Sequence, residues 1–211
     1  HLNSGTSIPA SRIYHDNGIV QISPSATAVE FTANGYKTAF RVMANDAQQG
    51  RVLGEYATGK LAAKKIAVID DRTGYGQGLA DEFIKSAQAN GAQIVAREYT
   101  NDKAYDFTAV LTAVKGRQAD LLFFAGMDPQ AGPMAKQLKA LAMNLKFMMG
   151  DGGYTPQFIK LAGDAAEGAY ASLPGVPKTS SVLYFGVAVK AKKLMLGCRP
   201  RLAMVLRISA S

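Results

Sequence analysis

Strand-like and helix-like segments alternate along almost the whole chain, and no other feature narrows the possible folds as much. Residues 65–70 (Lys-Ile-Ala-Val-Ile-Asp) and 120–125 (Asp-Leu-Leu-Phe-Phe-Ala) are nearly continuous apolar runs, as expected for strands that are buried on both faces. Shorter strand candidates occupy residues 19–23, 38–43, 92–99 and 145–149. Helical patterns fill the intervals, so the sequence predicts an α/β fold with doubly wound parallel sheets.

Short polar side chains mark where the helices are expected to begin. Asp46 stands three residues before Gln49, which is the spacing of a capping box. Asp128 and Thr155 each come directly before a proline, a residue that suits the first turn of a helix. We therefore expect caps at Asp46, Asp128 and Thr155. The pattern also places His15 within a helix, on its exposed side.

The positive charge of the chain is concentrated near its end. The formal net charge is +8, but seven of the 24 basic residues lie in 178–211, a segment without acidic residues. The other 17 basic residues are matched by 16 acidic ones, so residues 1–177 are almost neutral. A uniformly basic domain would suggest nucleic acid, whereas this distribution predicts no nucleic-acid partner. The basic segment either touches phosphate or lipid or is a solvated end.

The pattern of elements predicts two lobes joined by crossing segments. Residues 1–45 contain too few elements to close a sheet alone and are expected to be the remnant of an N-terminal lobe. Residues 46–168 make a nearly complete α/β lobe, and residues 169–177 are expected to cross between the lobes. Residues 178–211 form an atypical basic tail. An extended stretch over 36–44 is the expected first crossing.

Few features of the sequence indicate a cellular location. No run of about 18 apolar residues occurs, so we expect no membrane span. The chain begins His1-Leu2-Asn3 without a signal-peptide pattern, and we interpret this start as internal to a longer protein. Cys198 is the single cysteine, so an internal disulfide is excluded and the redox compartment stays open.

Chemically useful side chains follow the ends of the predicted strands, where open α/β sheets bind their ligands. Hydroxyls at the start of an early helix and in the loop after 19–23 suit a carboxylate, because helix N-termini favour anions. An acid among glycines suits an ammonium group, and an aromatic and a thioether side chain add apolar surface. The residues are Ser4, Thr6, Ser25, Thr27, Asp151, Tyr75 and Met127. Together they describe a pocket for a zwitterion with an apolar side chain, although each alone also fits a turn or capping role.

Other chemistries are supported by weaker patterns. Gly74, Gly76 and Gly78 resemble a dinucleotide loop, but the third glycine comes one position too early. Asp70 and Asp71 could hold magnesium, and the favoured alternative has one acid facing solvent and the other holding the turn. The sequence has neither a Cys/His cluster for zinc nor a G-x-S-x-G elbow for a serine nucleophile. We therefore expect no cofactor, no metal and no enzyme activity.

The same strand-end segments resemble those of a known family, in order from residue 1 to about 175. They include His1-Leu2-Asn3-Ser4, Ile22-Ser23-Pro24-Ser25-Ala26-Thr27, Asp46-Ala47-Gln48-Gln49-Gly50, Tyr75-Gly76-Gln77-Gly78-Leu79, Gly150-Asp151-Gly152 and Gly163-Asp164-Ala165-Ala166-Glu167-Gly168. The chain resembles the branched-chain amino acid binding proteins of ABC transporters. The resemblance implies the two-lobed type I periplasmic binding fold, with the first lobe incomplete.

The resemblance also implies a role for each matching residue. Ser4 corresponds to a ligand of the substrate carboxylate, and the loop Ser25-Ala26-Thr27 corresponds to contacts with carboxylate and ammonium through backbone and hydroxyl groups. Tyr75 corresponds to the aromatic residue that closes over the ligand from the second lobe. Asp151 corresponds to the partner of the ammonium group. Met127 stands where relatives often have an aromatic residue, which leaves the side-chain preference open.

The resemblance implies a periplasmic protein that captures leucine, isoleucine or valine and delivers it to an ABC permease. It also implies that the protein contacts the membrane only through that permease. The family has a further region before His1, and residues 178–211 depart from its pattern, so we expect an internal fragment with an atypical tail. The alternative is a ligand-sensing domain of a receptor or regulator, which an adjoining DNA-binding or membrane segment would identify. A nucleotide-dependent enzyme is a third alternative, testable by the absorbance of a copurified cofactor.

Overall fold

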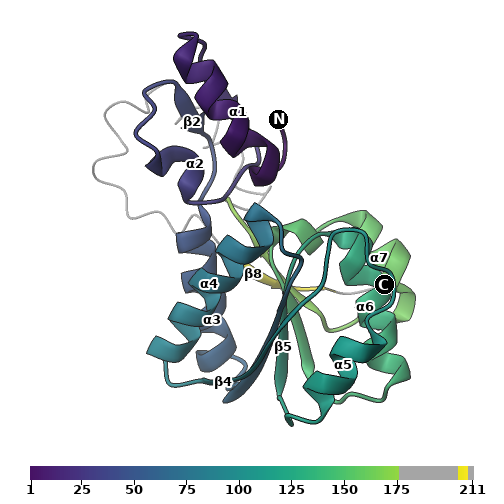
Figure 1. Ribbon diagram of the computed structural model, residues 1–211. Helices are drawn as coiled ribbons and strands as arrows, with labels where there is room; N and C mark the ends of the chain where they lie inside the picture. The colour runs from purple at the N-terminus through teal and green to yellow at the C-terminus, as the bar shows by residue number, and fades with distance from the viewer. Residues whose placement is uncertain (176–203, 209–211) are drawn as a thin grey trace.

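The computed structural model describes residues 1–175 and 204–208, which fall into two parts (Figure 1). The strands are β1 (Gln21–Ser23), β2 (Ala39–Arg41), β3 (Lys65–Asp70), β4 (Gln93–Tyr99), β5 (Leu121–Ala125), β6 (Lys146–Met149), β7 (Tyr170–Leu173) and β8 (Met204–Arg207). The helices are α1 (Ser4–Asp16), α2 (Glu30–Ala33), α3 (Asp46–Gly59), α4 (Gly74–Ala89), α5 (Thr108–Lys115), α6 (Asp128–Ala140) and α7 (Pro156–Ala162), with the 3-10 turns η1 (Asp151–Gly153) and η2 (Gly163–Ala166). We call residues 1–45 the small unit and residues 46–175 with 204–208 the large unit.

The large unit is built on one six-stranded sheet in the order β4-β3-β5-β6-β7-β8. The strands from β4 to β7 run parallel, and β8 pairs with β7 in the antiparallel direction. Helices α3 and α4 lie on one face of the sheet, and α5, α6 and α7 lie on the other (Figure 1). This arrangement confirms the predicted α/β fold with helices on both faces.

Alternate side chains of the central strands enter two separate cores. Ile66 and Val68 of β3 pack with Leu79 and Phe83 of α4, whose Phe83 ring stacks on Phe123 at 3.9 Å between centroids. Neighbouring strand residues point the other way and pack against α5, α6 and α7. Because both faces are covered, the strands contain few polar residues, which explains the apolar runs in the sequence.

The six strand candidates are confirmed to within a few residues, whereas two of the three expected helix caps are wrong. Asn45, not Asp46, caps α3, and its Oδ1 accepts a hydrogen bond from the Gln48 N–H at 3.1 Å. Met127 precedes α6, and the Asp128 carboxylate instead accepts a hydrogen bond from the Thr155 hydroxyl at 2.6 Å. The cap at Thr155 is confirmed, because its Oγ1 accepts from the Phe158 N–H at 3.0 Å.

The small unit contains two short parallel strands, and the described residues pack against one face of them. Phe31, Ala26 and Ala39 form a small core on that face. On the other face, Ile22 and Phe40 lie opposite each other in register and are 62% and 50% exposed. Among the described residues, this face of the small sheet therefore carries two apolar side chains that are largely exposed.

Two crossings between the units lie side by side. The first runs from β2 into α3 and the second leaves β7, and the Ala44 N–H donates to the Pro174 carbonyl at 3.3 Å. Next to this contact, the Asp46 N–H donates to the Thr27 carbonyl at 2.8 Å. The second segment contributes β7 to the large sheet, so that a crossing over 169–177 stays a prediction, and its course beyond residue 175 lies outside the described residues.

Two expectations about exposure are wrong. His15 is half-buried because its ring stacks on Tyr36 at 4.6 Å. Residues 204–208, near the end of the basic segment, are not a solvated end: they form β8, and Ile208 is buried in the core of the large unit. Cys198 and the rest of 178–211 lie outside the described residues. Among the residues that are described, none of the helices combines the length and apolar character required to cross a bilayer.

Candidate functional site

A cavity of about 470 Å³ lies between the small unit and the strand ends of the large unit. We call it the cleft. Its wall from the small unit comprises Leu2, Asn3, Ser4, Gly5, Thr6 and Ser25, and its wall from the large unit comprises Asp71, Thr73, Tyr75, Asp102, Met127, Asp151, Gly152 and Thr155. Six of the eight residues assigned to a ligand site from the sequence line it, namely Ser4, Thr6, Ser25, Tyr75, Met127 and Asp151.

The other two predicted residues, Ala26 and Thr27, are buried behind this wall. Neither is among the residues that line the cleft. The Thr27 carbonyl accepts the hydrogen bond from Asp46 N–H at the first crossing. Burial raises the pKa of the Asp46 carboxyl, and the Thr27 hydroxyl opposes part of that rise. Thr27 therefore contacts the first crossing, between β2 and α3, rather than the cleft.

The wall from the small unit is the N-terminal turn of α1. The Ser4 hydroxyl accepts a hydrogen bond from the Ala28 N–H at 3.1 Å, which attaches this turn to the loop after β1. The first N–H groups of a helix have no partner within the helix, and the helix dipole is positive at this end. This wall therefore offers hydroxyls and backbone donors suited to a carboxylate.

The opposite wall holds a carboxylate that is fixed by two side chains. The Tyr75 hydroxyl donates to Asp151 Oδ1 at 2.8 Å, while the same hydroxyl accepts from the Gly152 N–H at 3.1 Å. Gln49 Nε2 donates to the same oxygen of Asp151 at 3.0 Å. Tyr75 and Asp151 follow β3 and β6, two strands whose carboxyl ends lie at one edge of the sheet, which is why residues so distant in sequence meet.

Burial shifts the pKa values of this group. Desolvation raises the pKa of the Asp151 carboxyl, and the hydrogen bonds from Gln49 and Tyr75 oppose that shift. Desolvation, followed by the nearby Asp151 charge, raises the pKa of the Tyr75 hydroxyl. Desolvation and then the Asp151 charge raise the pKa of Asp46 to about 7. Tyr75 is therefore a neutral donor, and an added positive charge would be favourable beside Asp151.

The cleft is acidic. Asp71, Asp102 and Asp151 line it, and none of the described residues that line it is a lysine, arginine or histidine. A ligand carboxylate must therefore bind to hydroxyls and backbone N–H groups, and a ligand cation has carboxylates available. The zwitterion ligand itself stays a prediction, and this distribution of charge is one that such a ligand requires.

Gly152 allows the apolar side of the cleft to close tightly. A Cβ atom at this position would lie 2.7 Å from the Met127 sulfur and 3.3 Å from a Tyr75 ring carbon. The close neighbours of Gly152 are therefore two lining residues of the cleft, Met127 and Tyr75. Met127 lies at the start of α6, where its side chain gives the cleft an unbranched, adaptable surface.

The structure gives packing roles to the residues that had suggested a magnesium site or a dinucleotide loop. Both acids after β3 are buried, so the expectation that one faces solvent is wrong. Asp70 pairs with Arg97 at 3.3 Å, and Asp71 Oδ1 accepts from the Thr73 hydroxyl at 2.6 Å. A Cβ at Gly76 would overlap Asp71 and the Ala125 carbonyl, so packing alone requires this glycine. In the described part of the chain no three His, Cys, Asp or Glu side chains are grouped as metal ligands.

Sequence reasoning missed Gln49 and Asp46, which support Asp151 from outside the cleft. They were interpreted as a capping box, because a polar residue three positions after an acid at a helix start has that pattern. It also missed Asp102 as a lining residue. The position of Asp71 directly after β3 was the available signal for its place in the cleft, under the same rule that identified Tyr75.

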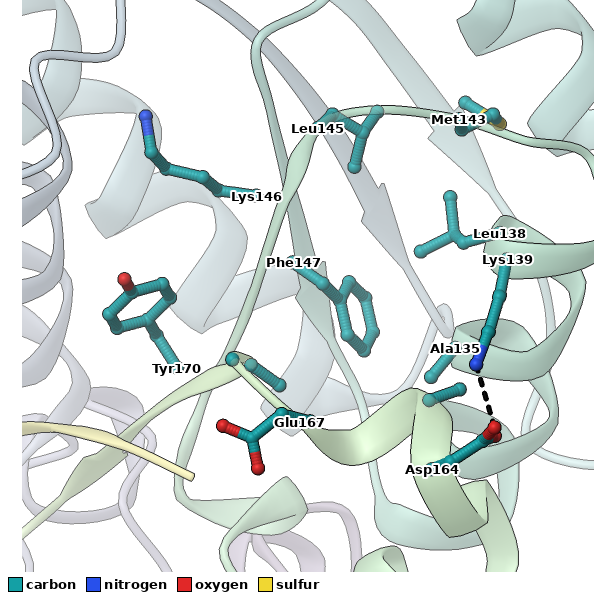
Figure 2. A pocket seen from close by; sticks show the side chains of 13 residues that line it. Ala135, Leu138, Lys139, Met143, Leu145, Lys146, Phe147, Asp164, Glu167 and Tyr170 are labelled. Carbon is teal, nitrogen blue, oxygen red and sulfur yellow. Dashed lines mark hydrogen bonds and ion pairs between the residues drawn. The ribbon is translucent and has the colours of Figure 1, made fainter. Parts of the chain in front are cut away.

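A second hollow of about 410 Å³ lies at the other end of the sheet, between α6, β6 and η2 (Figure 2). Figure 2 shows Phe147 and Leu138 beside it and the ion pair between Lys139 and Asp164, whose atoms lie 2.7 Å apart. This hollow is next to the amino ends of β6 and β7. Ligands of open α/β sheets bind at the carboxyl ends, so the cleft is the stronger candidate.

Comparison with known proteins agrees with the fold. The chain matches the periplasmic binding protein family over residues 2–182. It is 39% identical over 168 residues to the Leu/Ile/Val-binding protein homolog 1 of Brucella abortus (strain 2308), which covers 80% of this chain and 45% of that protein. It is 36% identical over 174 residues to a leucine-, isoleucine-, valine-, threonine- and alanine-binding protein of Pseudomonas aeruginosa, which covers 82% of this chain and 47% of that protein. The chain thus spans about half the length of these relatives.

Solved structures of binding proteins have the same fold as this chain. A leucine-binding protein from Thermotoga maritima superposes with a TM-score of 0.82 at 26% identity, over 92% of this chain and 56% of that one. A branched-chain amino acid transporter substrate-binding protein from Streptococcus pneumoniae, solved with isoleucine, has a TM-score of 0.78 at 27% identity and the same coverage of 92% and 56%. These relatives are solute-binding proteins and not enzymes. The family match, the relatives and the α/β architecture together show that this chain belongs to the periplasmic binding proteins, with a fold of type I.

Proposed function

We propose that this protein binds leucine, isoleucine or valine in the cleft and delivers it to an ABC permease from the periplasm. The observation that carries the proposal is the pairing of two unlike walls around one cavity. One wall is the positive end of α1 beside the Ser4 and Ser25 hydroxyls, and the other is the Tyr75–Asp151 pair. An α-amino acid has a carboxylate for the first wall and an ammonium group for the second.

The size and the apolar surfaces of the cleft support a small aliphatic side chain. A volume of about 470 Å³ lies within the range of roughly 300–1,000 Å³ that is usual for small-molecule sites. Leu2, Met127 and the Tyr75 ring supply the apolar part of the lining. The names of the two relatives, which include leucine, isoleucine and valine, support the same class of ligand.

We further propose that the small and large units move as two lobes, hinged near residue 45 and, after β7, near residue 174. On this view, the ligand binds first to Ser4, Ser25, Ala26 and Thr27 of the small unit, and closure brings Tyr75 and Asp151 over it. The adjacent crossings, joined by the Ala44–Pro174 hydrogen bond, support a hinge at this place. Small-angle scattering should then record a smaller radius of gyration when leucine is added.

The direct test is a thermal-shift screen of the 211-residue protein against the twenty amino acids, followed by calorimetry with leucine. Two truncated ligands give the sharpest control: 4-methylpentanoate lacks the ammonium group, and isoamylamine lacks the carboxylate. We expect leucine, isoleucine or valine to raise the melting temperature and both truncated ligands to bind far more weakly. Equal binding of either truncated ligand would remove the support for a two-ended site, and a response confined to nucleotides would overturn the proposal.

A further inference from the structure

Gln49 is a polar side chain in a fully buried position. Its exposed fraction is 0%, and a buried amide destabilises a fold unless its groups are hydrogen-bonded. Gln49 Oε1 accepts from the Ser172 hydroxyl at 2.6 Å. Gln49 Nε2 donates to Asp46 Oδ1 at 3.1 Å and to Asp151 Oδ1 at 3.0 Å. This pattern fixes the orientation of the amide, because a flipped amide would turn its oxygen toward two carboxylates.

The three partners of Gln49 come from three functionally different places. Asp46 is the first residue of α3, where the first crossing enters the large unit, and its N–H is bonded to Thr27 of the small unit. Ser172 lies on β7, two residues before Pro174 of the second crossing. Asp151 lines the cleft. One buried amide therefore connects both crossings to the acid of the candidate site.

We propose that Gln49 is a positioning residue that holds the Asp151 carboxylate in the orientation that receives the ligand's ammonium group. This inference deepens the proposed function and rests on it. Asp151 Oδ1 accepts from Tyr75 on one side and from Gln49 on the other. Two donors from separate elements fix the carboxylate before the ligand arrives, whereas Tyr75 alone would leave it free to rotate. Preorganisation of this kind raises affinity because less ordering accompanies binding.

A second physical effect acts in the same direction. Asp46 and Asp151 are two buried carboxyls close enough for the charge of Asp151 to raise the pKa of Asp46. The two hydrogens of Gln49 Nε2 lie between them and favour the ionised form of both. Loss of this amide would leave the two acids facing each other without a shared donor, so both would hold protons more tightly.

The test compares Gln49→Met with Gln137→Met in the 211-residue protein. Gln137 is a matched control, because both ends of its amide are also hydrogen-bonded, with Oε1 accepting from Phe107 N–H and Nε2 donating to the Tyr105 carbonyl, but it lies on the far face of the sheet. Carbon-detected NMR of the aspartate carboxyls, without ligand, gives the titration midpoints of Asp46 and Asp151. We expect Gln49→Met to raise both midpoints and Gln137→Met to leave both unchanged. Unchanged midpoints in folded Gln49→Met would overturn the proposal.

A measurement on the unmodified protein covers the case in which Gln49→Met does not fold. The side-chain amide protons of Gln49 should exchange slowly with water and should shift as Asp151 titrates. Exchange at the rate of an exposed amide, with no response to the Asp151 titration, would also overturn the proposal. In proteins that fold, leucine affinity by calorimetry should fall about tenfold or more in Gln49→Met and remain within about twofold in Gln137→Met. Absence of leucine binding in the unmodified protein would contradict the proposed function while leaving the NMR result on Asp151 to stand by itself.

Discussion

The two units of this protein bury their sheets to very different extents. The six-stranded sheet of the large unit has helices on both faces and two cores of fully buried side chains. The two-stranded sheet of the small unit has a core on one face and exposed Ile22 and Phe40 on the other. Because apolar burial is the main stabilising term in folding, the large unit should determine the stability of the chain. The small unit contributes a wall of the cleft rather than a core.

The largest expected effect comes from the core of the large unit. Phe123→Ala removes a ring that is fully buried and stacked on Phe83. We expect it to lower the free energy of unfolding by about 3–5 kcal/mol, because it leaves a cavity where the ring was. Urea denaturation followed by circular dichroism measures this change. A loss of less than about 1 kcal/mol would show that the large unit does not dominate stability.

The next effect concerns the cleft, to which each unit supplies one wall. Asp151→Asn should weaken leucine binding by about 2–5 kcal/mol, because the ligand ammonium loses its charged partner.

Ser4→Ala on the facing wall should weaken leucine binding about fivefold, which is the usual effect of losing one neutral hydrogen bond. Calorimetry at one pH compares the two variants. Asp102→Asn, which changes another acid of the same wall, is the control, and a loss equal to that of Asp151→Asn would remove the special role of Asp151.

A third prediction concerns the acid at the junction between the units. The pKa of Asp46 is about 7 in the folded protein, above its ordinary value of 3.8, so the folded state binds this proton more tightly than the unfolded state. The stability that the proton confers is complete below about pH 4 and is lost as the pH rises through 7. The groups that act on Asp46 are Asp151, Arg41, Thr27 and Gln49.

Asp46→Asn tests this linkage because it replaces the carboxyl by a neutral amide. Relative to the unmodified protein, the variant should gain stability as the pH is raised from 5 to 8. Melting temperatures over this range, measured for both proteins in buffers of equal ionic strength, give the difference. Parallel pH profiles for the two proteins would show that Asp46 does not titrate in this range.

The smallest effect is expected on the exposed face of the small unit. The double change Ile22→Thr and Phe40→Ser should alter the free energy of unfolding by no more than about 0.5 kcal/mol per site, since both side chains are largely in water already. Chemical denaturation measures the change. A loss of several kcal/mol would mean that this face is covered in solution, and the contrast between the two units would then no longer hold.

The fold was predictable from the sequence wherever a segment carries its own signal. The apolar runs of β3 and β5 identify buried parallel strands by themselves, and parallel strands bring their carboxyl ends together. This rule was enough to place Tyr75 and Asp151 at one edge of the sheet. Ser4 and Ser25 also reach the cleft, but a serine at a helix start looks the same whether it caps or binds.

The remainder depends on contacts that no local pattern encodes. Gln49 meets Ser172, a residue 123 positions away, and its burial follows from that packing rather than from its neighbours in sequence. His15 has the helical spacing of an exposed residue, yet Tyr36 from the loop after α2 covers it. Asn45 and Asp46 are both good caps by type, and the tight position of Asp46 beside Thr27 decides between them.

The antiparallel strand β8 has a consequence for how the chain folds during its synthesis. Its residues fill the edge of the sheet beside β7, and Ile208 completes one of the two cores. Until the ribosome has passed this point, β7 presents unpaired backbone groups that can capture a strand of another chain. The nascent protein therefore depends on β8 for protection against aggregation, and a chain released before residue 204 should form inclusion bodies more readily than one released after residue 208.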